Sequence, residues 1–445
     1  MRETRVNGSG AHRLTPFHIF DTRLHADPSR VVLRPFHLGW QARGAPSERA
    51  LKLVEDVVML GAQAAAEEYA RVRHDFAERH WQTEAMFRER FDQVADDLGL
   101  DAETFDDTRK LLIGAYFCHE YTYSAAALMN PSIVPHPDQS GLLDGSCRFV
   151  MSLRAVGEGH ISSIAFREGI AHRDGTFDLW PQTAFATAVD LDDESMHDSD
   201  DAVTVHCHPD STISNSVIFP ITEQQLGGLE DLRLVRFQHG PQDYEFIGTY
   251  TAYSGSSIRS ELLRTRDFRS FQLEPIHGAA GRNKGMALFP QKIAGRYAMV
   301  GRQDGKNLFY LTSDRLDCWE DEGSLLMEPE YPWEFIQIGN CGSPIRTEAG
   351  WLLFTHGVGA MRKYALGCAL LDLEDPSKLI GRVREPVLTA VDADRAGYVP
   401  NVIYTCGALK VGNGADARLL VPYGISDSAV GFATAPIRDL LDLMV

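Results

Sequence analysis

The feature that most constrains the fold is a repeated pattern of paired β-type runs, which continues from about Asn130 towards the C-terminus. Each unit has a short apolar or β-branched run, a turn containing Gly, Asp or other polar residues, and a second run. Hairpins repeated at such intervals are typical of β-propellers, in which every blade is a small antiparallel sheet. The five units are residues 149–154 with 161–166, 248–253 with 262–265, 297–302 with 308–312, 351–356 with 365–370, and 419–424 with 429–434.

These units predict an all-β fold class, a five-bladed β-propeller with an N-terminal helical extension. A β-sandwich built from the same hairpins is the structural alternative. The interval between the first two units is the longest, and it contains an acidic stretch, residues 190–201, that is typical of a solvated loop. We expect residues 1–128 to form an N-terminal segment with the helical extension, and residues 129–445 to form the propeller.

Residues 47–98 have helical rather than β-type patterning. Apolar residues such as Leu51 and Val54 recur near helical spacing, and no glycine or proline occurs between Gly61 and Gly99, so we predict two helices. Asp101 is placed to cap a third helix. This region carries no motif for chemistry, and we expect it to serve packing or the formation of a homo-oligomer.

The charge balance limits the kinds of partner that the chain can bind. Its formal net charge is −19, which argues against a nucleic-acid partner, because such partners need a basic footprint. Any anionic substrate would need a local cluster of arginine and lysine. No long apolar run predicts a membrane span, and no apolar segment of a signal peptide follows Met1. The seven cysteines are dispersed, which favours reduced thiols and a cytoplasmic location.

Several polar residues lie at matching ends of the predicted strands. In a propeller, the ends of the inner strands of all blades converge on one axial channel. Polar side chains at these ends would therefore face one pocket. The residues that we expect to form this set are Arg154, Asp231, Arg302, His356 and Asp427.

The segment from Glu230 to Arg233 comes directly before a β-type run. Asp231 and Arg233 would point to the same side of an extended chain, because side chains alternate along a strand. The arginine would then hold the carboxylate ionised or bind an anion beside it. A surface ion pair is the alternative interpretation of this pattern.

A second polar segment, residues 281–285, combines two cations and an amide between glycines. Arg282, Asn283 and Lys284 in such a loop could bind an anion, and an ordinary basic turn is the alternative. The pair His206 and His208 lacks further ligands at metal-type spacing, so no metal site is expected. No serine lies in a nucleophile elbow, so a serine hydrolase is not expected.

Taken in order, the motifs of the chain resemble glycoside hydrolase family 130, which contains β-mannoside phosphorylases and related β-mannosidases. The resemblance extends from about Asn130 to the C-terminus. The segments that carry it are residues 230–233, 248–253, 282–284 with 287–293, 342–345 with 350–351 and 356–358, 398–402 with 406–407, and 423–427.

The resemblance implies an inverting β-mannoside phosphorylase with a propeller catalytic domain. Such an enzyme cleaves a β-mannosidic bond with phosphate and gives α-mannose 1-phosphate, with Asp231 as the general acid. Asp427 resembles the aspartate that holds the mannose at the cleavage point. The implied partners are a β-mannoside oligosaccharide and inorganic phosphate as co-substrate, without a cofactor, nucleic acid or membrane. The implied substrate- and phosphate-binding residues are Asn130, Ser132, Arg154, Arg233, Arg282, Asn283, Lys284, Arg302, His356 and Asp427.

The chain departs from the usual family motifs at four positions. Leu232 replaces a proline, Gly285 replaces a common aspartate and Thr355 replaces a tyrosine. Gln337 replaces a lysine that contacts phosphate in the phosphorylases. Loss of that cation weakens an anion site by about 1–3 kcal/mol.

The departure at Gln337 leaves two other functions open. An inverting β-mannosidase would use water in place of phosphate and would need a second carboxylate as its base. Glu334 is one candidate base, and Glu230 is another, although on a regular strand Glu230 would point away from Asp231. A non-catalytic sugar-binding propeller is the third function.

Overall fold

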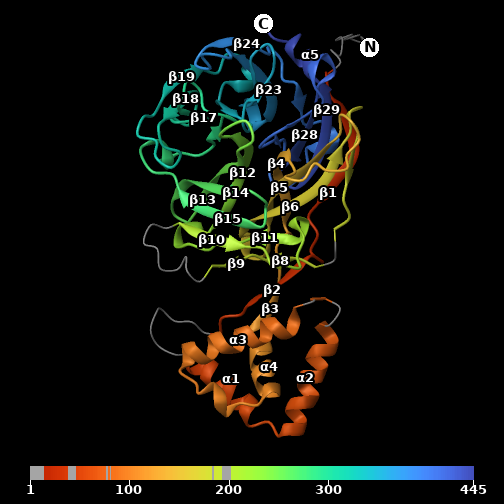
Figure 1. Ribbon diagram of the computed structural model, residues 1–445, viewed down its shortest axis with the longest axis vertical. Coiled ribbons are helices and arrows are strands. Elements are labelled where there is room, and N and C mark those ends of the chain that lie inside the picture. Colours follow the sequence, from red (N-terminus) through yellow and green to blue (C-terminus); the bar gives the residue numbers. More distant parts are fainter. Residues whose placement is uncertain (1–14, 39–46, 77–78, 81, 183–184, 193–201) are drawn as a thin grey trace, which may run out of the picture.

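The computed structural model describes residues 15–38, 47–76, 79–80, 82–182, 185–192 and 202–445. Strands make up most of the regular secondary structure of the described chain, and four α-helices lie together at one end of the molecule (Figure 1). The prediction of a mainly β chain with an N-terminal helical region is therefore confirmed. Most of the acidic stretch 190–201 lies outside the described residues.

All five predicted hairpins are present as antiparallel strand pairs. The short apolar or β-branched runs and the turns between them were sufficient to locate them. The pairs are β5 (Cys147–Val156) with β6 (Ser162–Ala171), β13 (Tyr244–Tyr253) with β14 (Ile258–Thr265), β17 (Tyr297–Gly301) with β18 (Leu308–Ser313), β22 (Trp351–Val358) with β23 (Tyr364–Leu371), and β28 (Arg418–Ile425) with β29 (Ala429–Pro436).

The remaining strands extend these hairpins into larger sheets. A 12-stranded sheet contains the first two hairpins, and only the parallel pair Gly228–Ser162 joins β12 to β6 within it. Its other strands are β4 (Ala127–Pro135), β7 (Phe177–Leu179), β8 (Thr187–Ala188), β9 (Asp190–Leu191), β10 (Val203–His206), β11 (Ser216–Ile218), β12 (Gly228–Gln238) and β15 (Ser270–Pro275).

Three further sheets complete what we call the β-body, the assembly of all sheets except the β2–β3 pair. One contains four strands, the next six and the last five. The strands that they add are β16 (Ala287–Leu288) and β19 (Ser324–Met327); β20 (Gln337–Asn340), β21 (Ile345–Arg346), β24 (Leu379–Arg382) and β25 (Leu388–Thr389); and β1 (His18–His25), β26 (Ile403–Tyr404) and β27 (Leu409–Val411), with the short helix α5 (Ile437–Leu441) after β29.

The last sheet joins strands from opposite ends of the chain. β1 pairs antiparallel with β29, with His18 opposite Thr434 and His25 opposite Ala429. No pattern in the sequence predicts this pairing. None of the eight residues of β1 is fully buried, and its apolar residues, Ile19, Phe20 and Leu24, do not alternate with polar ones, so β1 lacks the pattern that marks a half-buried strand.

The helical unit, residues 48–116, contains one more helix than the sequence predicted. The break between α2 and α3 follows no glycine or proline, so no stop signal marks it in the sequence. Asp101 caps only a short 3₁₀ turn, whereas Asp106 accepts a hydrogen bond from Arg109 N–H and caps the last helix. The helices are α1 (Glu48–Val58), α2 (Ala62–Phe76), α3 (Thr83–Leu98) and α4 (Asp107–Tyr116).

The helical unit has its own apolar core and connects to the β-body through a two-stranded ribbon. Val54, Phe91 and Leu112 are buried within one cluster of the helical unit. The ribbon pairs β2 (Val31–Pro35) with β3 (Cys118–Thr122) and lies between the two parts (Figure 1). The described helices include none long and apolar enough to cross a membrane.

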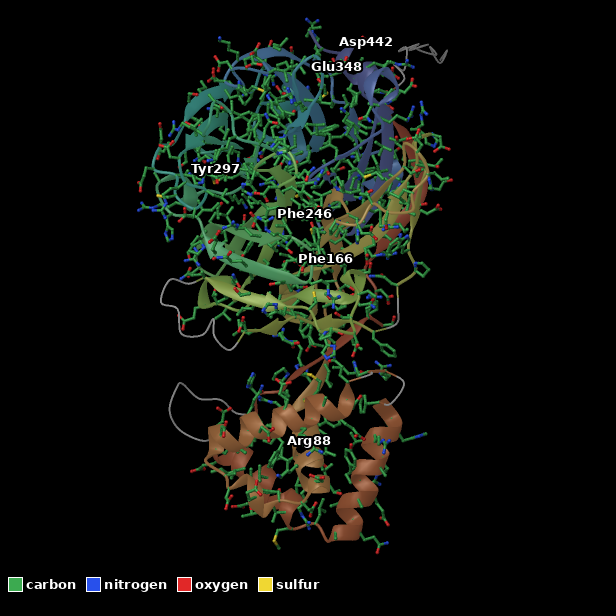
Figure 2. All side chains as sticks on the ribbon, in the orientation of Figure 1. Arg88, Phe166, Phe246, Tyr297, Glu348 and Asp442 are labelled. Carbon is green, nitrogen blue, oxygen red and sulfur yellow. The ribbon has the colours of Figure 1, made fainter. Side chains whose placement is uncertain are left out.

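Buried aromatic residues connect the first two hairpins within the 12-stranded sheet. Phe166 of β6 and Phe246 of β13 are fully buried, and both pack near Phe268, with ring centroids 5.9 and 4.8 Å from the ring of Phe268. Figure 2 places both in the lower half of the β-body, while Arg88 lies in the helical unit. Fully burying one such side chain stabilises the fold by about 1.5–3 kcal/mol, so this contact holds the first two hairpins together.

Candidate active site

One polar cavity of about 380 Å³ collects residues from all parts of the β-body. It receives all five residues that the sequence analysis grouped at strand ends, Arg154, Asp231, Arg302, His356 and Asp427. Five basic and three acidic side chains line it. The complete lining is Asn130, Arg154, Glu230, Asp231, Arg233, Thr251, Lys284, Gly285, Arg302, Gln337, Gly339, Asn340, His356, Arg362, Tyr364, Val402, Tyr404 and Asp427.

Asp231 lies on a bulge of β12. The register of β12 against β13 shifts between Glu230 and Arg233, and Asp231 has a left-handed backbone with φ 55°. Such a conformation is strained for a residue with a side chain and is common at functional sites. The bulge interrupts the alternation of side chains, so Glu230 and Asp231 both line the cavity. The expectation that Glu230 points away from Asp231 is therefore wrong.

Asn130 reaches the same carboxylate from a second bulge. The register of β4 shifts between Met129 and Ser132, and Asn130 has φ 48°. Pro131 lies within this bulge, where its missing N–H costs no ladder hydrogen bond. The Asn130 Nδ2 donates to Asp231 Oδ1 at 2.6 Å. Two bulged strands therefore fix the orientation of one carboxylate.

Arg154 of β5 bridges the two neighbouring carboxylates. Its Nη2 donates to Glu230 Oε1 at 2.6 Å, and its Nη1 donates to Asp231 Oδ1 at 3.3 Å. Its Nε donates to Ser162 Oγ at 2.9 Å. The guanidinium thus reduces the repulsion between two acids that are adjacent in sequence.

The three acids of the cavity have separate electrostatic environments. Burial on its own would raise the pKa of Asp231, but the Arg154 and Arg233 guanidiniums outweigh burial and lower it below its ordinary value. Burial raises the pKa of Glu230, although Arg154 opposes this effect. Burial and then the charge of Asp231 raise the pKa of Asp427 to about 6. Carboxyl groups whose pKa values are pushed apart in one cleft are typical of acid–base sites.

Four cations of the cavity have no carboxylate within ion-pair distance among the described residues: Arg233, Lys284, Arg302 and Arg362. Arg233 donates to the Tyr404 hydroxyl, and its buried Nε has no hydrogen-bond partner in the described part of the chain. Lys284 is exposed and Arg302 is half-buried. These groups leave donors available to an anion.

His356 lines the same cavity as these cations, and its imidazole ring is uncharged near neutral pH. Burial, followed by the charges of Arg302 and Arg233, lowers the pKa of His356 to about 3. Its ring stacks near Tyr364 at 5.8 Å and meets Tyr404 edge-on at 4.9 Å. His356 can therefore contribute a hydrogen bond or shape the wall, but it adds no positive charge at neutral pH.

Four residues that the sequence analysis assigned to the site do not line this cavity. Ser132 is fully buried, and its hydroxyl accepts a hydrogen bond from Leu234 N–H. Arg282 is exposed, and the Asn283 carbonyl accepts a hydrogen bond from Ser260 Oγ. In this segment only Lys284 of the three polar side chains reaches the cavity.

Glu334 is the fourth of these residues, and both oxygens of its carboxylate already accept hydrogen bonds from the protein. It is 1% exposed, and its Oε1 accepts a hydrogen bond from Arg382 Nη2 at 2.5 Å. Its Oε2 accepts from the N–H groups of Glu330 and Tyr331 at 3.0 and 3.1 Å. The geometry therefore does not support the expectation that Glu334 activates water.

Other residues of the cavity were not singled out from the sequence as site residues. Asn340 and Tyr404 lie in or beside the family motifs, which could have indicated them. Arg362 follows β22 in a turn where it has φ 54°, and no sequence signal marks that conformation. Among the described residues no group of His, Cys, Asp and Glu is arranged to hold a metal ion.

Comparison with known proteins agrees with this geometry. The family model Glyco_hydro_130, described as beta-1,4-mannooligosaccharide phosphorylase, matches residues 195–445. The chain belongs to glycoside hydrolase family 130. The match includes Asp231, Lys284, Arg302, His356 and Asp427.

Curated relatives within this family carry phosphorylase names. A 1,2-beta-oligomannan phosphorylase of Thermoanaerobacter sp. is 34% identical over 224 residues, which are 49% of this chain and 72% of the relative. A beta-1,2-mannobiose phosphorylase of Listeria innocua is 29% identical over 230 residues, or 50% of this chain and 62% of that one. A beta-1,4-mannooligosaccharide phosphorylase of Ruminococcus albus is 31% identical, with 40% of this chain and 55% of the relative aligned.

Solved structures support the same fold. The beta-1,2-mannobiose phosphorylase of Listeria innocua, in complex with beta-1,2-mannobiose, covers 72% of this chain and 92% of its own, with a TM-score of 0.50 and 19% identity. A putative glycosidase of Bacteroides thetaiotaomicron has a TM-score of 0.51 at 19% identity, with 72% of this chain and 89% of the other covered. At this identity the likeness concerns the fold.

Proposed function

We propose that the protein is an inverting β-mannoside phosphorylase that converts a β-mannoside and phosphate to α-mannose 1-phosphate. The observation that carries this proposal is the placement of four cations without carboxylate partners in the same cavity as Asp231. Cations gathered in a protein of net charge −19 repel one another unless an anion lies among them. The phosphorylase names of the relatives point to phosphate as that anion.

In this mechanism Asp231 is the general acid. A phosphate oxygen attacks the anomeric carbon of the mannose while the bond to the leaving oxygen breaks. The leaving oxygen takes the electron pair and a proton from Asp231, and the proton of hydrogen phosphate restores the acid. Asp231 is ionised in the empty site, because its pKa is lowered by Arg154 and Arg233. Phosphate bound at Arg233 offsets that charge and raises the pKa of Asp231 towards the value that an acid needs.

Asp427 and Asn130 hold the sugar in this proposal. Asp427 has a pKa of about 6, so near neutral pH it accepts hydrogen bonds from sugar hydroxyls. Asn130 keeps one oxygen of Asp231 occupied at 2.6 Å and so directs the other oxygen to the substrate. Arg233, Lys284 and Arg302 bind phosphate, and arginine does so through its planar fork of donors.

We also propose that the β-body is a five-bladed propeller. Three of the five hairpins each belong to a separate sheet of four to six strands, the first two share the 12-stranded sheet, and all four of these sheets supply residues at or near strand ends to one cavity. The single residue pair between β6 and β12 is consistent with two neighbouring blades inside the 12-stranded sheet. We place the domain boundary at residue 128, with strand β1 added to the last blade from the N-terminal segment.

The second candidate is an inverting β-mannosidase of the same family. It is favoured by Gln337, which lines the cavity where the phosphorylases have a lysine, and by the second and third carboxylates of the cavity. Glu230 and Asp427 are the candidate bases, since a water molecule needs a carboxylate in the cavity to activate it. A non-catalytic sugar-binding protein is the third candidate and predicts no turnover.

The experiment that separates these functions measures two products from β-1,2- and β-1,4-mannobiose. A phosphorylase consumes phosphate with saturation and releases mannose 1-phosphate, whereas a hydrolase releases mannose at full rate in phosphate-free buffer. Lys284→Ala should raise the phosphate KM by about tenfold, because a charge-assisted hydrogen bond is lost, and should change the sugar KM less. Lys378→Ala removes an exposed lysine outside the cavity and serves as the matched control. Free mannose at full rate without phosphate would instead establish the hydrolase.

A further inference from the structure

A short turn connects the two strands whose ends carry Arg154 and its partner Ser162. Residues 157–161 connect β5 to β6, and Gly159 and His160 have left-handed backbones with φ 68° and 62°. The turn follows Arg154, which lines the cavity, and it precedes Ser162, whose hydroxyl accepts the Arg154 Nε hydrogen bond at 2.9 Å. The turn that carries His160 is therefore next to the strand ends that hold Arg154.

An exposed tyrosine lies next to this histidine. The ring of Tyr398 is 6.0 Å from the ring of His160, and Tyr398 is 57% exposed. The Tyr398 N–H donates to Ser428 Oγ at 2.6 Å, and Ser428 follows Asp427 of the cavity. Neither ring lines the cavity itself, but both are exposed, and they adjoin the two segments that carry the cavity residues Arg154 and Asp427. An aromatic face together with a polar tip is suited to contact a sugar, which presents both C–H and hydroxyl groups.

The turn is held by the ribbon that leads to the helical unit. Tyr121 of β3 is buried, and its hydroxyl donates to the Glu158 carbonyl at 2.8 Å. A Cβ on Gly157 would lie 2.7 Å from the Tyr121 hydroxyl and 2.5 Å from the Thr122 carbonyl. The close approach leaves room for glycine alone, so the backbone of the turn is fixed against β3.

The two rings come from other sheets than two of the cavity cations, Lys284 and Arg302. Lys284 precedes β16 and Arg302 follows β17, both in the four-stranded sheet. His160 adjoins β5 and β6 of the 12-stranded sheet, and Tyr398 precedes β26 of the last sheet; these two sheets touch through the Leu128 N–H to Ser428 carbonyl hydrogen bond at 3.3 Å. Displacement with inversion puts phosphate and leaving sugar on opposite faces of the mannose. With phosphate at Lys284 and Arg302, the leaving sugar extends away from these two cations, towards the rings.

We propose that His160 and Tyr398 form the wall that binds the leaving sugar, and that Tyr121 is the positioning residue that sets this wall from the ribbon of the helical unit. The assignment of the leaving sugar rests on the proposed function. It gives the helical extension a role in substrate selection, because the ribbon that joins it to the β-body also fixes the turn.

The test separates the sugar KM from the phosphate KM and kcat. Tyr398→Ala and His160→Ala should each raise the KM for a β-mannobiose by about three- to tenfold, the range for loss of one aromatic contact. Tyr121→Phe removes one hydrogen bond and should raise that KM by about threefold. The phosphate KM and kcat should stay within about twofold, as expected for lost binding that acts equally on substrate and transition state.

Tyr123→Phe is the matched control. Tyr123 follows the same ribbon, and its hydroxyl accepts a hydrogen bond from Arg30 Nε at 2.5 Å rather than contacting the turn, so its sugar KM should remain that of the wild type. If the wild type releases mannose without phosphate, the proposed function fails, while the sugar KM of the variants still tests the wall. Unchanged sugar KM values in folded Tyr398→Ala and Tyr121→Phe proteins, or an equal rise in the Tyr123→Phe control, would overturn the inference.

Discussion

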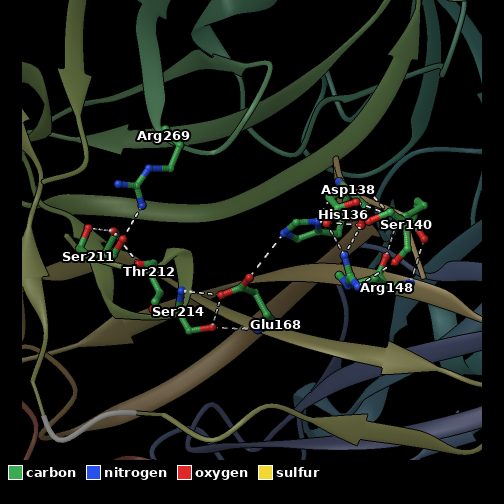
Figure 3. Close-up of polar contacts among 11 residues, drawn as sticks. His136, Asp138, Ser140, Arg148, Glu168, Ser211, Thr212, Ser214 and Arg269 are labelled. Atoms are coloured by element: carbon green, nitrogen blue, oxygen red, sulfur yellow. Dashed lines mark hydrogen bonds and ion pairs between the residues drawn. The ribbon is translucent and has the colours of Figure 1, made fainter. Parts of the chain in front are cut away.

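Two buried groups of polar residues in the β-body differ in whether all of their charged groups have partners within the protein. In the outer network, Glu168 Oε2 accepts hydrogen bonds from Ser214 N–H at 3.0 Å and from Ser214 Oγ at 2.7 Å, and its Oε1 lies 3.4 Å from His136 Nε2 (Figure 3). In the cavity, by contrast, Asp231 lies beside two other acids and cations without partners. Glu168 has its partners within the protein, whereas the cavity has groups that only a ligand can match.

The comparison indicates which buried polar residues stabilise the fold and which ones serve catalysis. A buried carboxylate that is fully hydrogen-bonded stabilises the native state. A cluster of like charges costs stability and is kept where catalysis requires it. We therefore expect substitutions in the cavity to change activity and those in the outer network to change the free energy of unfolding.

The largest expected effect is that of Asp231→Asn. The amide cannot protonate the leaving oxygen, so kcat/KM for β-mannobiose should fall by about 10² or more. The variant should remain folded, because Asn130 and Arg154 can still donate to the remaining carbonyl oxygen. Turnover is measured by release of mannose 1-phosphate and folding by thermal unfolding. Near-normal turnover in the folded variant would remove Asp231 from the role of acid.

The next effect is a pH-dependent gain in stability for Asp427→Asn. The pKa of Asp427 is raised to about 6 from the usual 3.8, so the native state binds more protons than the unfolded state between these values. The contribution of Asp427 is complete below 3.8 and is lost as the pH rises through about 6.

Asparagine does not titrate, so Asp427→Asn should gain about 2–3 kcal/mol over the wild type between pH 4 and pH 7.5. Denaturant unfolding of both proteins at several pH values measures this difference. A difference that stays constant with pH would show that burial and the neighbouring charges do not raise the pKa of Asp427. The variant should also lose activity, since Asp427 holds the sugar.

Glu168→Gln tests the expectation that the network around Glu168 contributes to stability rather than to activity. It should lower the free energy of unfolding by about 2 kcal/mol, because a charge-assisted hydrogen bond to a buried group is weakened. Burial would raise the pKa of Glu168, but His136 and Ser214 lower it overall, so this stability should be present above the usual pKa of 4.5 and lost as the pH falls through the lowered value. The kcat should stay at the wild-type value; a large loss of kcat in the folded variant would contradict the separation.

The smallest expected effect is that of Gln337→Lys, which restores a cation to the cavity. It should lower the phosphate KM by about fivefold, equivalent to about 1 kcal/mol for one added charge-assisted contact that is partly solvated. The sugar KM serves as the internal control and should not change. A hydrolase would show no effect of phosphate in either protein.

The sequence was sufficient for those parts of the fold that local patterning determines. Each of the five hairpins has two short apolar or β-branched runs with a turn between them, so each was located without tertiary information. The break between α2 and α3 and the pairing of β1 with β29 were not predicted. Both depend on contacts between distant residues rather than on a local signal.

The site also contains residues that a local pattern indicates and residues that it does not. Strand ends indicated Asp231, Arg302 and Asp427 correctly as neighbours in one cavity. Glu230 was misjudged, because the rule of alternating side chains fails at a bulge. Glu334 was proposed as a base because its partner, Arg382, lies 48 residues away, so no residue near Glu334 in the sequence indicates the ion pair.

The pairing of β1 with β29 also has a consequence for the order of folding. The helical unit lies between β1 and β4 along the chain, so it is an insertion within the β-body, and its separate core lets it fold while later strands are still being synthesised. The last sheet, however, cannot close until residues 429–436 return to residues 18–25. Closure over so long a loop is slow compared with the formation of hairpins. Until then β29 has an unpaired edge, and we expect aggregation during refolding to begin there.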